Sequence, residues 1–145
     1  KVPSLAGSEY VLTEFGHDCT YDHARDVLND LIANGYIPVI AHTERCGIIQ
    51  KDPPLAERFC KMGCRIQINA GGILGTEGSV EKRTCRKLLQ EDLADIVASD
   101  SHDMDKRCCR MKECMIYVEK KYGTERARRL FESNPGMIIG LTGEI

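Results

Sequence analysis

The stretch that decides the fold is residues 20–42, TYDHARDVLNDLIANGYIPVIAH. Its first half repeats apolar residues at the spacing of one helix face, namely Ala24, Val27, Leu28, Leu31 and Ile32. The Asn34-Gly35 pair is typical of a helix end. Residues 37–41 are a short, unbroken apolar run that predicts a buried strand, and His42 follows it. The stretch therefore predicts a helix packed beside a strand, which is the repeating unit of α/β proteins.

The same alternation continues along the rest of the chain. Further strands are expected over residues 10–15, 65–69 and 94–98. Further helices are expected from Pro53-Pro54 to Gly63, over 80–90 behind a Ser79 cap, from Met111 to Gly123, and from a Thr124 cap to about Glu132. Strands and helices that alternate at this spacing predict βαβ units, with a parallel sheet and helices packed outside it. No repeat or linker interrupts the pattern, so we expect a single domain.

The composition narrows the functional classes. With 145 residues, of which 42% are hydrophobic and 29% charged, the chain has the composition of a globular domain with a buried core. The formal net charge is -2 and the basic residues are interleaved with acidic ones, so we expect no nucleic-acid partner. No apolar run approaches the ~20 residues needed to cross a bilayer. We therefore expect a cytoplasmic protein that does not insert into membranes.

The chain contains eight cysteines. Cys60 and Cys114 fall in segments with helical periodicity, and the chain has enough apolar residues to fold without disulfides, so we expect reduced, structural thiols. A zinc cluster is the alternative, formed by Cys60, Cys64, Cys108 and Cys109. The paired CxxC spacing of zinc knuckles is absent, which speaks against that cluster.

Metal-ligand side chains occupy the ends of the predicted strands: Glu14, His42, Asn69, Asp100 and His102. The carboxyl ends of parallel strands lie at one edge of a sheet, where ligands bind. Asp100 and His102 are two residues apart, so both can point into one cavity. Two carboxylates and two imidazoles that converge suit Mn²⁺, Fe²⁺ or Zn²⁺. Taken singly, Glu14 can be a solvated acid, His42 a core histidine and Asp100 a helix cap.

Arg45 follows His42 by three residues and is the expected phosphate-binding side chain. A guanidinium beside a metal cluster matches two phosphate oxygens at once. The alternative is that Arg45 pairs with Glu44 or with a loop carbonyl. His17 follows Glu14 by three residues and can edge the same cavity, whereas His23, at the start of a helix, is expected to be solvated.

Five segments resemble the successive motifs of one known family. They are 10–15 (YVLTEF), 35–45 (GYIPVIAHTER), 67–71 (QINAG), 98–102 (ASDSH) and 130–135 (LFESNP). In this order they resemble the capsular-polysaccharide tyrosine phosphatases of the polymerase-and-histidinol-phosphatase (PHP) superfamily, over nearly the whole chain. The resemblance implies an α/β fold with parallel strands and outer helices, part of a distorted (β/α)7 barrel. It also implies a site for up to three metal ions, usually manganese, with iron or zinc as alternatives.

The resemblance also assigns roles to individual residues. It implies that Glu14 bridges two metals, that His42 binds one of these, that Asp100 holds the first metal and that His102 holds the third. Arg45 corresponds to the phosphate-side arginine. Possible rim residues are His17, Asn69 and Asp103. The chain departs from the family at Gly16 and Thr43, where proline is usual, and at Ser101 and Asp103, where alanine and asparagine are usual. None of these changes removes a ligand, but His17 and Asp103 leave the choice of substrate open.

The family's opening His-x-His motif does not occur in these 145 residues. We therefore expect residues 1–145 to be the C-terminal portion of one PHP-type domain, without the N-terminal strands. The activity would then belong to a longer protein. An incomplete barrel leaves apolar surface uncovered, so we expect this chain alone to be inactive and to form a homo-oligomer.

The expected function is metal-dependent hydrolysis of a phosphomonoester. The resemblance implies phosphotyrosines on the tail of a bacterial tyrosine kinase as substrate, and a role in capsular or exopolysaccharide synthesis. One alternative is a non-catalytic, truncated PHP domain that binds a kinase or a metal. Another is a small-molecule phosphatase of the histidinol-phosphate type.

A cysteine-nucleophile phosphatase is a further alternative, because Cys19 and Arg25 have the required spacing. The intervening loop lacks glycine and places Asp22 where a phosphate dianion would sit, which speaks against this chemistry.

Overall fold

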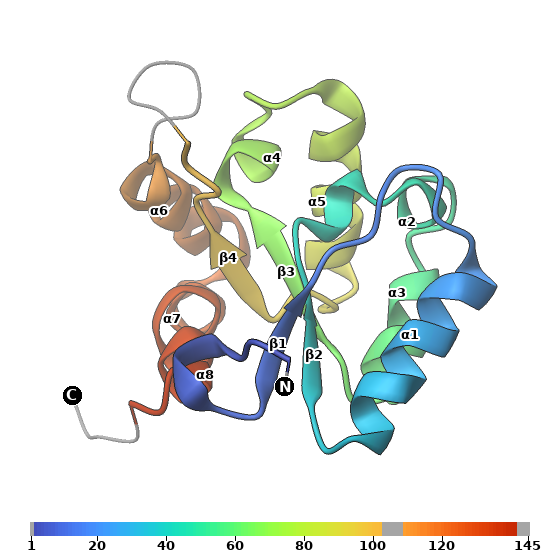
Figure 1. Ribbon diagram of the computed structural model, residues 1–145. Coiled ribbons are helices and arrows are strands. Elements are labelled where there is room, and N and C mark those ends of the chain that lie inside the picture. Colours follow the sequence, from blue (N-terminus) through green and yellow to red (C-terminus); the bar gives the residue numbers. More distant parts are fainter. Residues whose placement is uncertain (1, 103–108, 142–145) are drawn as a thin grey trace.

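The computed structural model describes residues 2–102 and 109–141 and contains one parallel sheet with helices around it (Figure 1). The strands are β1 (Tyr10–Thr13), β2 (Ile37–Ile40), β3 (Arg65–Asn69) and β4 (Ile96–Ala98). They lie in the order β1-β2-β3-β4, and each pairs with its neighbour in parallel. The predicted α/β class with parallel strands is therefore confirmed.

The connections between the strands are helical, as βαβ units require. The α-helices are α1 (Tyr21–Ala33), α2 (Gly47–Lys51), α3 (Leu55–Lys61), α4 (Ala70–Leu74), α5 (Ser79–Gln90), α6 (Met111–Tyr122), α7 (Thr124–Arg128) and α8 (Asn134–Ile138). Two 3-10 turns, η1 (Leu5–Gly7) and η2 (Thr43–Arg45), and a π-helical turn, η3 (Arg129–Ser133), complete the described elements. In Figure 1, α1, α2 and α3 lie to the right of the strands, and α6, α7 and α8 lie to the left.

The main core lies between the sheet and the outer helices. Its fully buried side chains include Leu28, Phe59, Ile66, Ile68, Leu88 and Leu130. Because side chains alternate along a strand, a second and smaller cluster forms on the other face of the sheet. That cluster consists of Tyr10, Val39, Ile96 and Ile138. The helix expected between Thr20 and Asn34 buries Ala24 and Leu28, as its spacing predicts.

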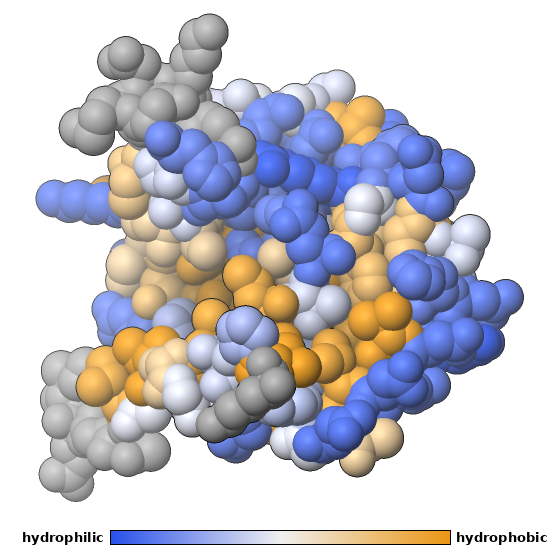
Figure 2. Space-filling view, viewed as in Figure 1, coloured by the Kyte–Doolittle hydropathy of each residue, from blue (hydrophilic) through white to orange (hydrophobic). Residues whose placement is uncertain are grey.

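The face of the sheet that bears the smaller cluster is only partly covered. Leu12 of β1 is 54% exposed, and Met137 and Ile139 at the end of α8 are 52% and 51% exposed. Figure 2 shows hydrophobic residues at the surface across the middle of the viewed face. None of the helices within residues 2–102 and 109–141 is long and apolar enough to span a membrane.

Two predicted helix caps are wrong. α5 begins at Ser79 itself, with Gly78 at the cap position, and α7 begins at Thr124, with Gly123 at the cap position. Both glycines have positive φ, 138° and 96°, a backbone conformation that side-chain-bearing residues rarely adopt. The Thr124 hydroxyl donates instead to Glu119 Oε1 at 3.0 Å.

The observed elements also differ in length from the predicted ones. β1 and β2 end at Thr13 and Ile40, and β4 begins only at Ile96. The last predicted helix continues through the π turn η3 into α8. No sequence pattern predicted α2 and α4, each five residues long. Helices this short are marginal on their own, so packing must hold them in place.

Candidate metal centre

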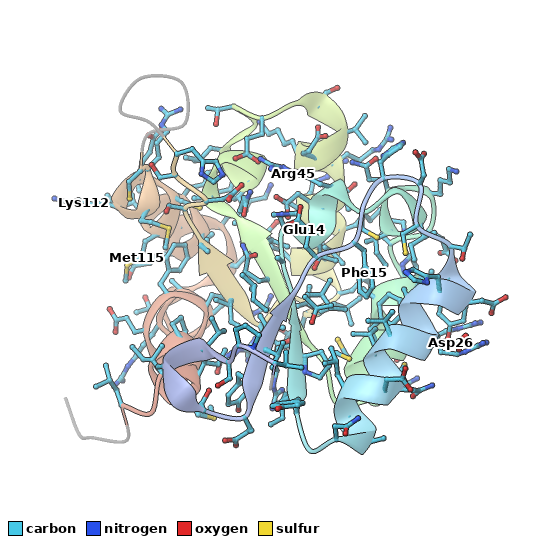
Figure 3. The ribbon with its side chains drawn as sticks, in the orientation of Figure 1. Glu14, Phe15, Asp26, Arg45, Lys112 and Met115 are labelled. Carbon is cyan, nitrogen blue, oxygen red and sulfur yellow. The ribbon has the colours of Figure 1, made fainter. Side chains whose placement is uncertain are left out.

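The predicted ligands gather at the carboxyl ends of the strands. Glu14 follows β1 directly, and His42 and Asp100 each lie two residues beyond the end of a strand. The parallel register places Thr13 opposite Ile40. Glu14, His42, Gln67 and Asp100 line one pocket of about 360 Å³ whose remaining walls are apolar, including Leu12 and Ile138. Figure 3 places Glu14 and Arg45 over the same end of the sheet.

Glu14 and His42 form the first carboxylate–imidazole pair of the site. His42 Nε2 lies 3.2 Å from Glu14 Oε1, and the two side chains are 15% and 71% exposed. The backbone N–H of His42 donates to Gln67 Oε1 at 2.7 Å, which fixes the loop after β2 against β3. The other ring nitrogen, Nδ1, is buried and has no hydrogen-bond partner among the described residues. A buried imidazole nitrogen without a partner suits a metal ligand.

Asp100 and His102 form the second pair. His102 Nε2 lies 3.2 Å from Asp100 Oδ1, and the His102 side chain is 60% exposed. The second oxygen of Asp100 accepts hydrogen bonds from Arg45 Nη1 at 3.1 Å and from Asn69 Nδ2 at 3.2 Å. Asp100 is therefore the residue on which His102, Arg45 and Asn69 converge.

Both His42 and Asp100 have left-handed backbone, with φ values of 30° and 46°. Residues other than glycine adopt this conformation at a cost of order 1–3 kcal/mol, and such residues concentrate at functional sites. Two of the four non-glycine residues with positive φ in the described chain are thus predicted metal ligands. In this backbone conformation, just beyond the ends of β2 and β4, both side chains line the pocket.

Arg45 is held by two carboxylates from different parts of the chain. Its Nη1 contacts Asp100 Oδ2 at 3.1 Å, and its Nη2 contacts Glu77 Oε2 at 3.0 Å. Partial burial works to lower the pKa of Arg45, but the hydrogen bond to Glu77 and the nearby negative charges outweigh it and raise the pKa. The alternative predicted that Arg45 pairs with Glu44 or with a loop carbonyl. The observed partners are instead Glu77 and Asp100.

The sequence reasoning missed Glu77, which lies in the loop between α4 and α5 and is 13% exposed. Glu77 Oε2 also accepts a 3.4 Å hydrogen bond from Asn69 Nδ2. A Cβ added at Gly71 would come within 2.7 Å of Glu77 Oε1, so this glycine leaves room for the carboxylate. Glu77 follows no strand, and its spacing carries no signal for a site.

Glu44 was also missed as a site residue and lies beneath the site, fully buried. Its Oε1 accepts the backbone N–H of Asn69 at 3.2 Å, whereas Oε2 has no hydrogen-bond partner among the described residues. Burial raises the pKa of Glu44 to about 7, well above its usual value. Gln67, the third missed residue, donates its Nε2 to Asn69 Oδ1 at 2.9 Å and so links the two ligand pairs.

The four predicted ligands form two separate pairs, Glu14 with His42 and Asp100 with His102. Within residues 2–102 and 109–141, no three histidines, cysteines or acidic residues surround a common ion position. The donor types and the unpartnered His42 Nδ1 fit a divalent metal. The described residues therefore form two carboxylate–imidazole pairs and no closed ligand shell, and their role as metal ligands stays a prediction.

Two of the possible rim residues are not joined to these pairs. His17 is exposed and lies against Gly47 of α2, and no described contact links it to Glu14 or His42. Asp103 lies outside the described residues. Asn69, the third rim candidate, is fully buried and contacts Asp100 directly.

The structure gives little support to the two alternatives that involve cysteines, a cysteine-nucleophile phosphatase and a zinc cluster. Burial raises the pKa of the Cys19 thiol, which disfavours a thiolate nucleophile, and Arg25 pairs with Asp22 and Asp26. Burial also raises the pKa of Cys60 to about 11 and that of Cys64 to about 12, so both thiols stay protonated at neutral pH. Cys108 lies outside the described residues, and the described cysteines are free thiols.

Comparison with known proteins identifies the family of the chain. Residues 1–140 match the family described as capsular polysaccharide synthesis, CpsB/CapC. The chain is 33% identical over 144 residues to tyrosine-protein phosphatase CpsB of Streptococcus pneumoniae, covering 96% of the chain and 59% of that protein. It is 35% identical over 130 residues to tyrosine-protein phosphatase YwqE of Bacillus subtilis (strain 168), covering 90% of the chain and 51% of that protein.

A solved structure is similar over nearly all of the chain. It belongs to a set of crystal structures of YwqE from Bacillus subtilis and CpsB from Streptococcus pneumoniae, which are described as unique metal-dependent tyrosine phosphatases. The match has a TM-score of 0.87 and 32% sequence identity, and covers 98% of this chain and 57% of the solved one. The chain thus spans little more than half the length of the relatives it matches. The motifs, the parallel sheet and these comparisons together show that the chain belongs to the CpsB/CapC family.

Proposed function

We propose that this chain forms part of a metal-dependent protein-tyrosine phosphatase and supplies one side of its metal site. The observation that carries the proposal is the meeting of two carboxylate–imidazole pairs and Arg45 at one end of a parallel sheet. The metal-dependent tyrosine phosphatase activity of the structurally similar relatives supports it. In this proposal residues 1–145 are the C-terminal portion of a single PHP-type domain, and the activity is that of a longer protein.

Each residue of the site has a role that follows from its chemistry. Glu14 and Asp100 supply negative charge and oxygen donors to the ions, and His42 and His102 supply imidazole nitrogens. When bound, divalent ions supply Lewis acidity toward water and toward the phosphate oxygens. Carboxylate and imidazole donors suit manganese, with iron and zinc as alternatives, and we propose up to three ions.

Arg45 binds the phosphate group of the substrate. Its planar guanidinium can hold two phosphate oxygens and stabilise charge that develops on them. Glu77 and Asn69 act through other residues: Glu77 orients the guanidinium, and Asn69 holds the Asp100 carboxylate. The substrates we propose are phosphotyrosines on the tail of a bacterial tyrosine kinase, in capsular or exopolysaccharide synthesis and in the cytoplasm.

The experiment has a binding arm and a turnover arm. Binding of Mn²⁺ to the 145-residue chain is measured by calorimetry for the wild type, for His42→Ala and for Asp100→Ala. Both substitutions should weaken binding, and Asp30→Ala, which removes a carboxylate on α1, should not. Equal affinity in all four proteins would remove these residues from the metal site.

Turnover is measured on a protein extended N-terminally through the His-x-His segment of the parent gene, if that gene encodes one. Phosphotyrosine peptide and histidinol phosphate are compared as substrates. EDTA should abolish activity, Mn²⁺ should restore it, and Cys19→Ser should leave it nearly unchanged. Activity that survives chelation and is lost in Cys19→Ser would favour the cysteine mechanism.

A further inference from the structure

A second pocket, away from the predicted metal ligands, is strongly basic. It lies between α5 and α6, has a volume of about 370 Å³, and is lined by Ile73, Ser79, Lys82, Arg83, Arg86, Leu89, Tyr117, Lys121 and Tyr122. Ile73 and Leu89 are buried and form an apolar floor. Among the residues that the structure describes, the lining side chains include four cations and no carboxylate. The pocket therefore offers an anion a concentrated positive charge on a protein whose formal net charge is only -2.

Three cations of this pocket have no acidic partner among the described residues. Within the part of the chain that the structure describes, no ion pair involves Lys82, Arg83 or Arg86. Arg86 lies three and four positions beyond the other two on α5, a spacing at which like charges face one another and destabilise a helix. Binding of an anion to such a cluster relieves this repulsion.

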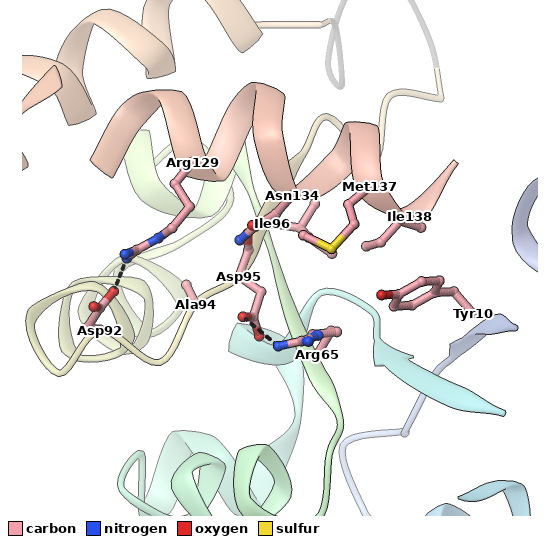
Figure 4. A pocket seen from close by; sticks show the side chains of 10 residues that line it. All are labelled: Tyr10, Arg65, Asp92, Ala94, Asp95, Ile96, Arg129, Asn134, Met137 and Ile138. Atoms are coloured by element: carbon pink, nitrogen blue, oxygen red, sulfur yellow. Dashed lines mark hydrogen bonds and ion pairs between the residues drawn. The ribbon is translucent and has the colours of Figure 1, made fainter. Parts of the chain in front are cut away.

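Another arginine-containing pocket of the molecule provides the contrast. It has a volume of about 320 Å³ and contains two arginines, each paired with an aspartate, Arg129 with Asp92 and Arg65 with Asp95 (Figure 4). There the arginine charges are satisfied within the protein. The two arginines of the pocket between α5 and α6, by contrast, have no carboxylate partner among the described residues.

Aromatic rings line the basic pocket as well. Lys121 Nζ lies 5.5 Å from the ring centroid of Tyr117 and 5.7 Å from that of Tyr122. It donates to the Tyr117 hydroxyl at 3.1 Å, which raises the pKa of Lys121, while the charge of Arg86 acts in the opposite direction. Arg86 of α5 and Lys121 of α6 therefore face the same space. Guanidinium groups beside tyrosine rings can bind a phosphate and pack against the aromatic ring that bears it.

We propose that the pocket between α5 and α6 is a docking site for a tyrosine-phosphorylated, acidic polypeptide segment. The proposal rests on the proposed function and deepens it: one phosphotyrosine of a tail binds here while another reaches the metal site. A compact cluster of four cations fits one or two phosphate groups, whereas nucleic acids and membranes require a broader basic surface.

One short helix, α4, connects the two sites along the chain. α4 begins directly after Asn69 of the metal centre and contributes Ile73 to the basic pocket. Four helical residues correspond to a rise of about 6 Å. An extended peptide advances about 3.3–3.6 Å per residue. In this proposal a tail with several phosphotyrosines a few residues apart occupies both sites, and docking at the pocket raises the local concentration of the next phosphotyrosine.

Binding is the readout that tests the proposal. A fluorescent peptide with two phosphotyrosines separated by acidic residues is titrated into the 145-residue chain, and anisotropy gives the Kd. The double substitution Arg83→Glu/Arg86→Glu should weaken binding at least tenfold. The matched control, Lys87→Glu/Lys120→Glu, makes the same change in net charge at positions of α5 and α6 that do not line the pocket, and should alter the Kd less than twofold.

Further variants keep the result interpretable. Arg83→Gln/Arg86→Gln removes the charge without reversing it and should weaken binding by a smaller factor. Circular dichroism checks that each variant is folded. Asp100→Asn should leave the Kd of a singly phosphorylated peptide nearly unchanged, because that peptide needs only the pocket, so a failure of the metal-site proposal and a failure of this one give different results. The unphosphorylated peptide should bind at least tenfold more weakly than the phosphorylated one.

Three results would overturn the proposal. The first is equal loss of affinity in the pocket variant and the control, which would mean a general charge effect. The second is equal affinity for phosphorylated and unphosphorylated peptide. The third is tighter binding to a single-stranded oligonucleotide of the same charge than to the peptide, which would identify nucleic acid as the ligand.

Discussion

Arg45 and Asp100, 55 residues apart in sequence, are joined by an ion pair of 3.1 Å between Nη1 and Oδ2. The contact links the loop after β2 to the loop after β4. It places the predicted phosphate-binding cation beside a predicted metal ligand, so a phosphate held by the guanidinium would also lie near the metal. Glu77 contacts the other Nη atom of Arg45 at 3.0 Å and so fixes the orientation of the guanidinium.

Arg45→Ala should reduce kcat/KM for a phosphotyrosine peptide by about a hundredfold in the N-terminally extended protein proposed above, the scale for losing one charge-stabilising donor. The melting temperature should change little, because the two carboxylate partners of Arg45, Glu77 and Asp100, keep hydrogen bonds from Asn69 Nδ2. Arg25→Ala is the control, since Arg25 is an exposed arginine that pairs with two aspartates outside the site. Steady-state kinetics and thermal denaturation give the two readouts. A large loss of stability with normal kinetics would make Arg45 a structural residue.

Glu44 should make the metal-free protein less stable as the pH rises. Its pKa is about 7 in the folded protein and 4.5 in a solvated carboxyl, so between these values the folded state binds more protons than the unfolded state. Stability contributed by the protonated form is therefore present at pH 4.5 and lost as the pH rises through 7. The full effect is on the order of 3 kcal/mol.

Glu44→Gln should remove most of this pH dependence. The measurement is the melting temperature between about pH 5 and about pH 8 in the presence of EDTA, and the largest difference from the wild type is expected at the upper end of that range. Glu57→Gln, which replaces an exposed carboxylate on α3, is the control and should follow the wild type. Parallel curves for wild type and Glu44→Gln would show that Glu44 is not the titrating group.

Gly47→Ala should destabilise the protein by about 1–3 kcal/mol, the usual range for overpacking. A Cβ at this position would lie 2.0 Å from the backbone oxygen of His17, and backbone cannot move aside as a flexible side chain can. Gly16→Ala is the matched control, because a Cβ there meets nothing within 4 Å. Urea denaturation of the two variants gives the comparison. Equal midpoints would mean that the segment containing His17 shifts freely.

The 145-residue chain should self-associate and lack turnover, because the face of the sheet that bears Leu12 is partly uncovered. Leu12→Lys should shift the mass measured by light scattering toward that of the monomer. Ile116→Lys changes a residue of similar exposure, 45% against 54%, on α6 and should not. A wild-type chain that is monomeric and turns over phosphotyrosine peptide as fast as an N-terminally extended protein would contradict this expectation.

The parts of the site that follow directly from strand ends could be predicted from the sequence. Glu14, His42 and Asp100 are identifiable because a polar residue after a buried strand falls at a known edge of a parallel sheet. Glu77 and Glu44 could not be found in this way. Glu77 reaches the site from a loop between two helices. Glu44 is buried in the turn η2, where its neighbours His42 and Arg45 are residue types that point more directly to a metal or phosphate site. Both positions depend on tertiary packing that has no local pattern.

The helix boundaries illustrate the same limit at smaller scale. α6 and the strand β3 were predicted within a residue because periodicity and a following glycine or polar residue mark them. The caps of α5 and α7 were misassigned, because Ser79 and Thr124 are favoured cap residues by type. The adjacent glycines, Gly78 and Gly123, take the cap position with backbone angles that the hydroxyl residues would not readily adopt.

Alternate residues of β3 serve two different purposes, because successive side chains point to opposite faces of the sheet. Ile66 and Ile68 face the main core, whereas Gln67 and Asn69 hydrogen-bond each other and support the metal centre. Changes at the isoleucines act on folding alone, whereas changes at the two buried amides also act on the predicted site. In the proposed phosphatase, substitutions at positions 67 and 69 would therefore alter the surroundings of His42 and Asp100 while the isoleucines that secure the sheet stay as they are.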